Sequence, residues 1–436
     1  MTPLSTTSNT STWRWLLVRN VYRLISPLLL LIALPSWLIK MARRGGWSTP
    51  IGERFSIYSG DEEWEPFGVM HFHAVSVGET LLALKLIRAI QIKNNNFTCV
   101  LAVSTATAYL VASENKLLGV RIVYAPVDLP WMVRRYIKRF SPTKIILIEA
   151  EAWPELLDQC QQQKIPVVLV NARLSPRSEK RYRALRAWIE PLFQKLDWVA
   201  VQEESDVARF TALGIEKERI YLTGSIKFDP TAERLPLMRD DFLALLAPIA
   251  GTRKIILGAS THDGEEVLLA KAVHNAGGFF LCVPRHAERR AEVKEALERA
   301  GFHVILKTEK SHPQPAENCC LVIDTTGELK DWTAHCDAVI IGKSFLALGG
   351  QNPCEAIMAN KPLLFGPHME NFEPLCTSLV AANGAVRIDE IADLTEEIVS
   401  LLASSERMKC MTINAAKILM SHSRATARTI DLLGIN

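Results

Sequence analysis

The sequence lacks the cysteine patterns of disulfide-bonded and zinc-binding proteins. Its nine cysteines are odd in number, and no two of them have CxxC spacing. This pattern predicts reduced thiols in a protein on the cytosolic side of the membrane rather than a disulfide framework. No DxD pair is placed to bind a divalent metal, and the ten histidines are scattered along the chain. We therefore expect an activity that needs no metal and no other cofactor.

The phosphate-binding loops of two large enzyme classes are missing as well. No GxGxxG follows the first expected strand, and the chain contains neither GxxxxGKS nor GxxxxGKT. These loops bring backbone N–H groups against the phosphates of dinucleotides and of nucleoside triphosphates. Their absence argues against a dinucleotide oxidoreductase and against a P-loop enzyme.

Acidic residues are absent from the first 51 residues, although six basic residues occur there. These are Arg14, Arg19, Arg23, Lys40, Arg43 and Arg44. Removing the six from the 50 Lys and Arg residues leaves 44, against 47 Asp and Glu. An excess of positive charge at one end only predicts an anionic surface there, and it argues against general nucleic-acid binding.

Residues 24–39 of this basic segment are uncharged and mostly apolar. As a helix they would be about 24 Å long, shorter than the roughly 30 Å hydrocarbon core of a bilayer, and Pro27 and Pro35 weaken a regular helix. Lys40 follows where a signal peptide has its small-residue site, so we expect no cleavage. Tryptophans and bases on both flanks favour an anchor that dips into the membrane or just crosses it, with the rest of the chain on the cytoplasmic side. The alternative is a buried core helix.

After residue 66, short apolar runs rich in β-branched residues alternate with longer amphipathic segments. The expected strands are 69–74, 99–104, 122–124, 144–148, 166–170 and 198–201, followed by 254–258, 279–283, 304–307, 321–324, 338–341 and 362–365. Strands separated by helical patterns of roughly 10–15 residues predict βαβ units and parallel sheets. A chain of 436 residues is too long for one typical core, and residues 220–230 have the composition of a linker. We therefore predict two Rossmann-like α/β domains facing a cleft, as in GT-B glycosyltransferases, with the hydrophobic anchor before them.

The loop SFLALGGQNPCE, after the strand expected at 338–341, has the features of an anion site. Its Gly-Gly pair lets the backbone approach a ligand closely. Asn352 suits the N-cap of a helix, Pro353 its first position and Glu355 its third, so free N–H groups would face the cleft. The alternative is that Glu355 only closes a capping box.

Three more loops of the second half follow expected strands. Arg285 could hold a phosphate by a bidentate contact, whereas a lone histidine such as His286 is more often structural. The other two loops are ASTHDGEE and DTTGEL. Four such loops on the rim of one domain predict a nucleotide site.

Carboxylates follow two expected strands of the first half. Glu79 lies in HAVSVGET, where a turn glycine leads directly into a helical pattern, and Glu149 and Glu151 follow the strand at 144–148. Because open α/β sheets bind ligands beyond the carboxyl ends of their strands, we expect these acids in the cleft. The alternatives are a helix N-terminal charge for Glu151 and a solvated turn for Glu149.

Basic side chains accompany these acids. Arg173 and Arg177 could contact phosphates or could pair with the nearby carboxylates. Lys227 lies in the expected linker, where it would overlook both domains.

The order of these motifs resembles that of the 3-deoxy-D-manno-octulosonic acid (Kdo) transferases, bacterial enzymes that place Kdo on lipid A precursor. The matching segments are HAVSVGET, EAEAWP, NARLS, TGSIKFD, ASTHDGEE, VPRHAER, DTTGEL, GGQNPCEA and KPLLFGPHMENF. The hydrophobic amino end also resembles the anchor of this family. The resemblance implies a GT-B fold with an anchor at 1–46, an acceptor (lipid A) domain at 47–224 and a CMP-Kdo-binding domain at 225–436.

The resemblance also implies a reaction, namely inverting, metal-independent transfer of Kdo from CMP-Kdo to lipid A precursor (lipid IVA) in lipopolysaccharide biosynthesis. The partners would be CMP-Kdo as co-substrate, the lipid acceptor and the lipids of the bacterial inner membrane at its cytoplasmic face, and not nucleic acid. Glu79 matches the general base of the family, and Glu149 and Lys227 match positions that stabilise the transition state. The segments that match its CMP contacts contain Arg285, His286, Gly327, Glu328, Leu329, Asn352, Pro353, Cys354 and Glu355. Two alternatives stay open: a GT-B lipid glycosyltransferase with another nucleotide-sugar donor, and a membrane-bound nucleotide-binding scaffold without turnover.

Overall fold

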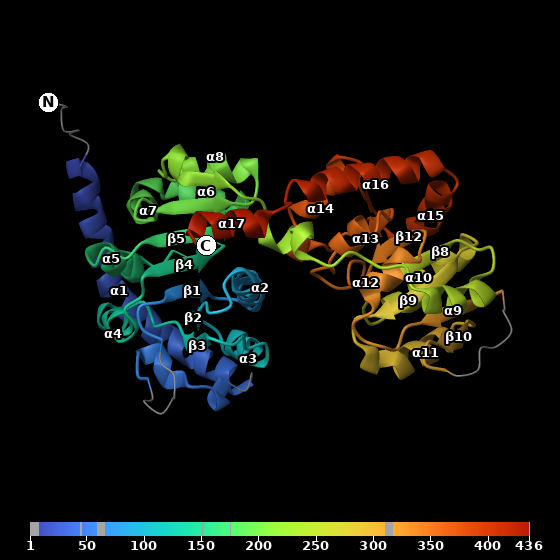
Figure 1. Cartoon of the computed structure of the whole chain (residues 1–436), viewed down its shortest axis with the longest axis horizontal. Helices are drawn as coiled ribbons and strands as arrows, with labels where there is room; N and C mark the ends of the chain where they lie inside the picture. The colour runs from blue at the N-terminus through green and yellow to red at the C-terminus, as the bar shows by residue number, and fades with distance from the viewer. Residues whose placement is uncertain are drawn as a thin grey trace. The chain divides into compact units, whose positions relative to one another are not determined.

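The structure is a computed structural model that describes residues 8–43, 46–58, 66–149, 152–174, 176–309 and 317–435. The contacts between residues divide the chain into two compact units (Figure 1). The first consists of Met1–Ala232 together with Arg424–Asn436, and the second consists of Glu233–Ser423. Each unit contains its own sheet and is described by itself.

The first unit is built on a parallel sheet of seven strands in the order β3-β2-β1-β4-β5-β6-β7. The strands are β1 (Met70–Ala74), β2 (Cys99–Val103), β3 (Val120–Tyr124), β4 (Lys144–Ile148), β5 (Val167–Ala172), β6 (Trp198–Val201) and β7 (Ile220–Leu222). Successive side chains of a strand point to opposite faces, so both faces of such a sheet need an apolar cover. On β2, for example, Leu101 belongs to one core cluster and Val100 to the other.

Helices cover both faces of this first sheet (Figure 1). One face packs against α2 (Val77–Lys93), α3 (Ala106–Glu114) and α17 (Ala425–Leu433), and the other against α4 (Pro130–Phe140), α5 (Pro154–Gln162), α7 (Arg186–Phe193) and α8 (Glu204–Ala212). Helix α6 (Pro176–Ala184) leads into α7. These layers make the first unit a Rossmann-like domain.

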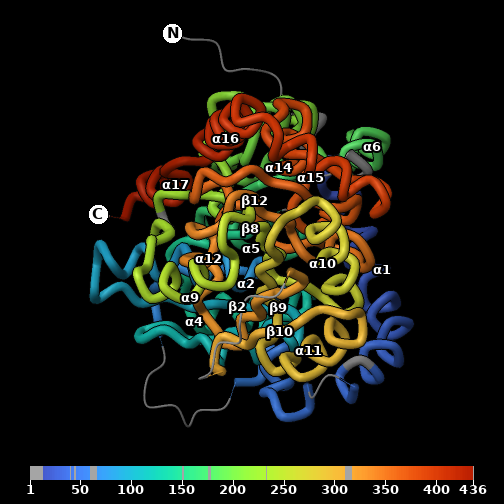
Figure 2. Tube along the Cα trace, turned by 90° about the vertical axis from the view of Figure 1, so that its right-hand side faces the viewer, coloured from blue at the N-terminus to red at the C-terminus, as the bar shows by residue number. Residues whose placement is uncertain are grey.

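The second unit repeats this architecture with the strand order β10-β11-β9-β8-β12-β13-β14, again all parallel. Its strands are β8 (Ile255–Thr261), β9 (Phe279–Pro284), β10 (His303–Leu306), β11 (Cys319–Val322), β12 (Ala338–Ile341), β13 (Leu363–Phe365) and β14 (Val386–Arg387). Its helices are α9 (Asp240–Ala250), α10 (Glu265–Asn275), α11 (Arg290–Arg299), α12 (Leu329–Ala334), α13 (Cys354–Met358), α14 (Leu375–Ala381), α15 (Leu394–Leu402) and α16 (Ser405–Met420). Helices α9 and α12 lie on one side of β8, where Phe242 and Trp332 stack at 3.7 Å, and α10 lies on the other side (Figure 2).

All twelve expected strands are present, with ends that differ from the expected ones by no more than three residues. The prediction of two parallel α/β domains is therefore confirmed. Two edge strands, β7 and β14, were not expected. Strand β7 lies in the segment interpreted as a linker, and both strands are too short, at three and two residues, to produce a periodic pattern.

The last helix, α17, packs on the first unit although it follows the second unit in sequence. Its Ile430 is buried in the same core cluster as residues of α2. The Asp229 carboxylate accepts hydrogen bonds from the backbone N–H groups of Arg424 (3.0 Å) and Thr426 (2.8 Å) at the start of this helix. The predicted domain 225–436 includes residues 225–232 and 424–436, which the contacts group with the first unit.

The hydrophobic amino end forms one helix, α1 (Ser8–Arg43), of 36 residues, which runs along the first unit (Figure 1). The helix continues through Pro27 and Pro35, which were expected to weaken it. By length and composition, the stretch Trp13–Arg43 could cross a membrane. Many of its leucines are exposed, Leu24 among them, so the alternative of a buried core helix is wrong.

Candidate active site

Glu79 is fixed just after β1, in the first turn of α2. Ser76 is the N-cap of this helix, and its Oγ accepts a hydrogen bond from the backbone N–H of Glu79 (3.2 Å). In return, the Glu79 carboxylate accepts from the Ser76 hydroxyl (2.8 Å) and from the backbone N–H of Val75 (2.7 Å). The Ser-x-x-Glu sequence thus forms a variant of the capping box, in which the Glu79 carboxylate accepts from the N–H of the residue before the N-cap, and Glu79 is only 8 % exposed. The local sequence therefore fixes the position of this carboxylate.

Glu149 follows β4 and has a left-handed backbone conformation, with φ of 65°. Its N–H donates to the carbonyl of Val170 on β5 (3.0 Å), so the residue stays tied to the sheet beyond the end of its own strand. Burial raises the pKa of its carboxyl group and the charge of Glu79 raises it further, whereas Lys227 and Arg173 act in the opposite direction. Because such effects act over short distances, Glu79, Glu149 and Lys227 share one electrostatic environment.

Lys227 belongs to the 3₁₀ turn Ile226–Phe228, which follows the edge strand β7. Asn171, at the end of β5, holds this turn, because its Oδ1 accepts from the backbone N–H of Ile226 (2.9 Å). Asn171 has φ of 54°, a conformation that asparagine tolerates better than most residues. The turn is buried while the Lys227 side chain is exposed, so a fixed backbone presents an accessible ammonium group.

The remaining charged residues of these loops are only partly described. The charge of Arg173 opposes the rise in the pKa of Glu149. Glu151 and Ser175 lie outside the described residues, as does the side chain of Arg177. The roles considered for Glu151 and Arg177 stay predictions.

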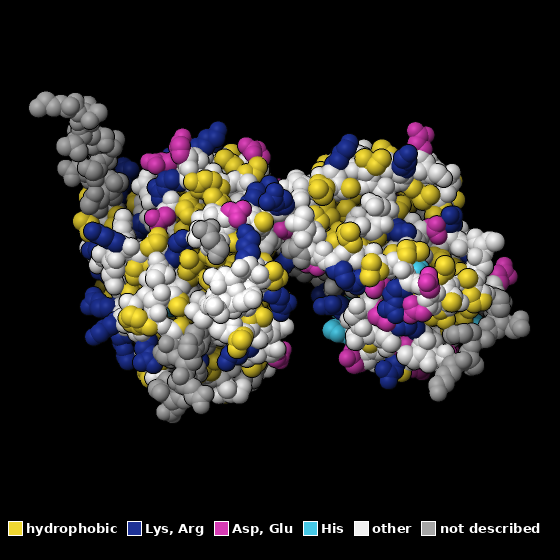
Figure 3. Space-filling model, in the orientation of Figure 1, with side chains coloured by type: hydrophobic (Ala, Val, Ile, Leu, Met, Phe, Trp, Pro, Cys, Tyr) yellow, Lys and Arg dark blue, Asp and Glu magenta, His cyan; other side chains and the backbone are white. Residues whose placement is uncertain are grey.

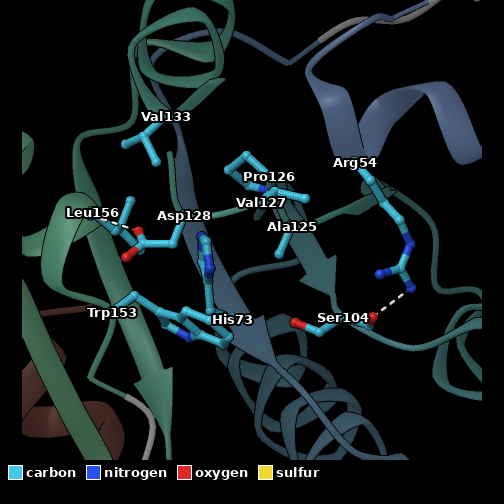
Figure 4. Close-up of a pocket in the computed structure, with 10 residues that line it drawn as sticks. All are labelled: Arg54, His73, Ser104, Ala125, Pro126, Val127, Asp128, Val133, Trp153 and Leu156. Carbon is cyan, nitrogen blue, oxygen red and sulfur yellow. Dashed lines mark hydrogen bonds between the residues drawn. The ribbon is translucent and has the colours of Figure 1, made fainter. Parts of the chain in front are cut away.

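A cavity of about 200 Å³ lies among the ends of β1, β2 and β3 (Figure 4). It is lined by Arg54, His73, Ser104, Ala125, Pro126, Val127, Asp128, Val133, Trp153 and Leu156. Burial lowers the pKa of His73 to about 4, so this imidazole is neutral at neutral pH. Sequence reasoning missed this cavity, although two histidines, His71 and His73, in an otherwise apolar strand are a signal that could have found it.

The second unit contains a larger pocket, of about 480 Å³, at the carboxyl ends of its strands. Its lining consists of Arg234, Ser260, Val283, Pro284, Arg285, Ala287, Thr325, Thr326, Gly327, Leu329, Lys330 and Glu355. Four of the predicted nucleotide-binding residues are among them: Arg285, Gly327, Leu329 and Glu355. The other five are described in the structure but do not line this pocket: His286, Glu328, Asn352, Pro353 and Cys354.

Glu355 contributes a carboxylate to this pocket. Its Oε2 atom is buried and has no hydrogen-bond partner among the described residues. Burial raises the pKa of its carboxyl group, and cations including Lys330 and Arg285 oppose that shift. A buried acceptor without a partner costs free energy, which a bound ligand with hydroxyl donors would recover. The pocket therefore suits a ligand that combines hydroxyl groups with negative charge.

Comparison with known proteins identifies the family. The family model described as 3-Deoxy-D-manno-octulosonic-acid transferase (kdotransferase) matches residues 49–230. A 3-deoxy-D-manno-octulosonic acid transferase of Haemophilus influenzae is 31% identical over 391 residues, which cover 88% of this chain and 90% of that protein. The enzyme of the same name from Bordetella pertussis is 31% identical over 437 residues, which cover 95% and 98%. The chain belongs to the Kdo transferase family.

This member of the Kdo transferase family is therefore a glycosyltransferase, and solved structures agree on its fold. A UDP-GlcNAc 2-epimerase from Neisseria meningitidis has a TM-score of 0.52 at 14% identity, covering 85% of this chain and 100% of that chain. A putative UDP-N-acetylglucosamine 2-epimerase from Listeria monocytogenes has a TM-score of 0.53 at 13% identity, covering 85% and 96%. Together with the two parallel sheets, these similarities confirm the predicted GT-B fold.

One segment of this Kdo transferase family member differs from its predicted structure. Helix α13 begins at Cys354, so Pro353 precedes the helix instead of occupying its first position. Asn352 still contacts the start of the helix, because its Oδ1 accepts from the backbone N–H of Cys354 (3.1 Å). The helix has only five residues, and Asn360, with φ of 54°, follows its end. The helix that follows the expected anion site is therefore little more than one turn long.

Two carboxylates of the quoted loops accept hydrogen bonds from other residues of the second unit. Glu328 accepts hydrogen bonds from Lys307 and Thr325. Glu265 accepts from the backbone N–H groups of Lys343 (2.6 Å) and Phe345 (3.0 Å), so it joins the loop after β8 to the loop after β12. Figure 3 likewise shows acidic and basic side chains side by side on the surface of the second unit.

The lining of the pocket in the second unit also includes Ser260, Lys330 and Arg234, which were not among the predicted site residues. Ser260 lies inside the motif ASTHDGEE, and Lys330 comes directly after DTTGEL, so both had a nearby signal. Arg234 lies in no motif, and its guanidinium is held by Asp331 (2.7 Å), a contact that only the fold reveals.

Proposed function

We propose that this protein transfers Kdo from CMP-Kdo to a lipid A precursor, lipid IVA, in lipopolysaccharide biosynthesis at the cytoplasmic face of the bacterial inner membrane. The observation that carries the proposal is the shared electrostatic environment of Glu79, Glu149 and Lys227 in a chain of the Kdo transferase family. We infer that the transferred sugar is Kdo because the relatives are named as Kdo transferases. The reaction proceeds with inversion and without a metal or another cofactor.

Glu79 is the general base in this proposal. A sugar hydroxyl is a poor nucleophile at neutral pH, so a positioned base must take its proton as the new bond forms. The hydrogen bonds from Val75 and Ser76 reach both carboxylate oxygens, so the base is oriented before the acceptor arrives. Inversion requires a base on the side of the sugar opposite the leaving group, and one carboxylate is sufficient for that task.

Glu149 and Lys227 stabilise the charges of the transition state. As Kdo leaves CMP, positive charge grows at the anomeric carbon and negative charge grows on the phosphate. The ionised Glu149 carboxylate stabilises the first of these charges, and the Lys227 ammonium stabilises the second. Lys227 and Arg173 also favour the ionised form of Glu149, which supports this division of roles.

CMP-Kdo binds in the pocket of the second unit. A volume of about 480 Å³ is within the range of ligand pockets. The buried Glu355 Oε2 accepts a hydrogen bond from a ribose hydroxyl, which gives that atom the partner it lacks among the described residues. Arg285, exposed at the end of β9, holds the phosphate by a charge-assisted hydrogen bond.

Mass spectrometry of lipid IVA incubated with the protein and CMP-Kdo tests the proposal. A product heavier by whole Kdo units supports the assigned sugar donor and acceptor, and the number of units gives the stoichiometry. An unchanged precursor, with the protein folded and a known Kdo transferase active alongside, refutes the assignment. A screen of nucleotide sugars then tests the alternative of another donor, because only CMP-Kdo releases CMP.

A further inference from the structure

The face of α1 that contacts the rest of the first unit includes polar side chains, although the helix is hydrophobic overall. The indole N–H of Trp15 donates to Asp158 (2.8 Å), and Arg23 forms a bidentate pair with Glu155, with both bonds at 2.8 Å. Asp158 is 3 % exposed and Glu155 is fully buried. A buried carboxylate that loses its partner is strongly destabilising, so these contacts fix the amino-terminal part of α1 on the unit.

A third buried carboxylate strengthens this docking. Asp128 accepts a hydrogen bond from the Tyr22 hydroxyl (2.9 Å), and it also accepts from the backbone N–H groups of Glu155 and Leu156, both at 2.9 Å. The same carboxylate therefore caps the start of α5 and binds α1. The position of α1 is thus connected to the packing of the first unit.

The carboxyl-terminal part of α1 is held by the same unit. The Arg54 guanidinium lies over the Trp37 ring, 5.3 Å from its centroid. Met41 is buried, and its side chain packs so closely on Gly46 that a Cβ atom there would lie 2.5 Å from Met41 Cε. Both ends of the helix are therefore fixed to one body.

Between these ends, α1 keeps one face on the unit. Residues with reduced exposure recur every three or four positions, namely at 15, 18, 19, 22, 23, 26, 27, 30, 34, 37 and 41. This is the spacing of a single helical face. From Trp15 to Met41, such a face is about 39 Å long.

The opposite face of α1 is apolar and exposed. Leu17, Leu24, Leu31 and Leu38 are seven residues apart and are 42 %, 79 %, 64 % and 36 % exposed. Beside them, an apolar groove of about 500 Å³ is lined by α1 and by Trp188 of α7. An apolar surface of this extent indicates a binding site for a partner.

We propose that α1 lies in the plane of the membrane, with this leucine face in the hydrocarbon of one leaflet, and that it does not cross the membrane. A spanning helix must place one end on the far side, which would break the buried contacts of Trp15 and Arg23 or those of Met41. In this orientation the exposed cations Arg14 and Arg43, at opposite ends of the helix, both meet the anionic headgroups of the same leaflet. Acyl chains of that leaflet fill the groove beside α7. This inference rests on the membrane association proposed above and does not depend on the sugar that is transferred.

Depth measurements on the full-length protein test the proposal. Cys410, the one exposed cysteine among the described residues, is first replaced by serine. Single spin labels are then attached in the variants Leu17→Cys, Leu24→Cys, Leu31→Cys and Leu38→Cys, in vesicles of phosphatidylethanolamine and phosphatidylglycerol. Power-saturation electron paramagnetic resonance, with oxygen and a nickel chelate as relaxants, measures the depth of each label.

The in-plane helix gives four similar depths within one leaflet. A spanning helix gives steps of about 10 Å between successive labels and a passage through the bilayer centre, and that result overturns the proposal. Four labels that all face water overturn it as well. The labelled side chains are exposed, so folding is unaffected. Kdo transfer by each variant is assayed separately, so failure of the proposed function is distinguishable from failure of this topology.

A matched pair of variants tests the docking contacts. Arg23→Gln removes the bidentate pair with Glu155, whereas Arg14→Gln removes an exposed cation of the same helix. We expect the label at residue 17 to become more mobile in the first variant and to stay unchanged in the second. Equal mobility in both variants contradicts a docked helix.

Discussion

The substitution Glu79→Gln separates the structural role of this side chain from its proposed role as the base, because it removes the carboxylate and keeps the shape. The glutamine carbonyl can still accept from the backbone N–H of Val75, and its amide can donate to Ser76. The capping box is therefore largely retained, and the expected loss of stability is no more than about 1 kcal/mol. The loss of a general base, by contrast, lowers turnover by about 10²–10⁴-fold, which corresponds to about 3–5 kcal/mol in the barrier.

The assay for Glu79→Gln follows CMP release together with the mass of the lipid product. Calorimetric titration with CMP should give an unchanged affinity, because the proposed CMP site lies in the other unit. Ser404→Ala is the matched control. It removes an N-cap side chain of the second unit, which accepts from the backbone N–H of Arg407 (3.1 Å). This variant should therefore lose the stability that an N-cap contributes while Glu79 and Glu149 stay unchanged. Turnover of Glu79→Gln within tenfold of the wild type, at equal stability, refutes Glu79 as the base.

Further predictions concern the other acids and the buried histidine. Glu149→Ala and Glu149→Gly should lose turnover equally. Thermal unfolding should show the glycine variant to be more stable by about 1 kcal/mol, because only glycine adopts φ of 65° without strain. Equal stability of the two variants contradicts backbone strain at this residue. Glu355→Met should weaken CMP binding about tenfold or more in calorimetry, since a hydrogen bond to a charged group is worth about 1.5–3 kcal/mol; an unchanged affinity removes Glu355 from the site. The pKa of His73 falls from 6.5 to about 4 on folding, so the unfolded chain takes up a proton first and stability falls as the pH drops from 6.5 towards 4. Between pH 7 and pH 5, denaturant titrations should show that the free energy of unfolding falls by about 2 kcal/mol less in His73→Phe than in the wild type. Equal decreases in the two proteins would refute His73 as the origin of the pH dependence.

Most of the sheet was predictable because buried parallel strands are continuous apolar runs. The strand Lys144–Ile148, with both faces covered, was predicted with both ends correct. Strand β7 was not, because its three residues lie at the sheet edge with Tyr221 and Leu222 exposed. The docking of α17 on the first unit also has no local signal, since it depends on Asp229, about 200 residues earlier in the chain.

The candidate site shows the same division between local and non-local information. Glu79 could be found because its capping box is four residues long and directly follows a strand. The lining of the cavity around His73 could not, because Arg54, Asp128 and Trp153 come from separate segments that only the fold brings together. The orientation of α1 could not be predicted for another reason. Arg23 pairs with a buried acid of the protein whereas Leu24 is exposed, so a count of apolar residues alone cannot show which side of the helix is docked.

The proximity of Glu79 and Glu149 links the two halves of the proposed reaction. A carboxylate has about four lone-pair positions, so the hydrogen bonds from Val75 and Ser76 leave positions on Glu79 for the proton of the acceptor. When Glu79 takes that proton, its negative charge disappears, and with it the repulsion that raises the pKa of Glu149. Lys227 and Arg173 then favour the ionised form of Glu149 unopposed by that charge. In the proposed reaction, proton removal from the acceptor would therefore favour the ionised form of Glu149 as positive charge develops at the anomeric carbon, so the two steps would reinforce each other.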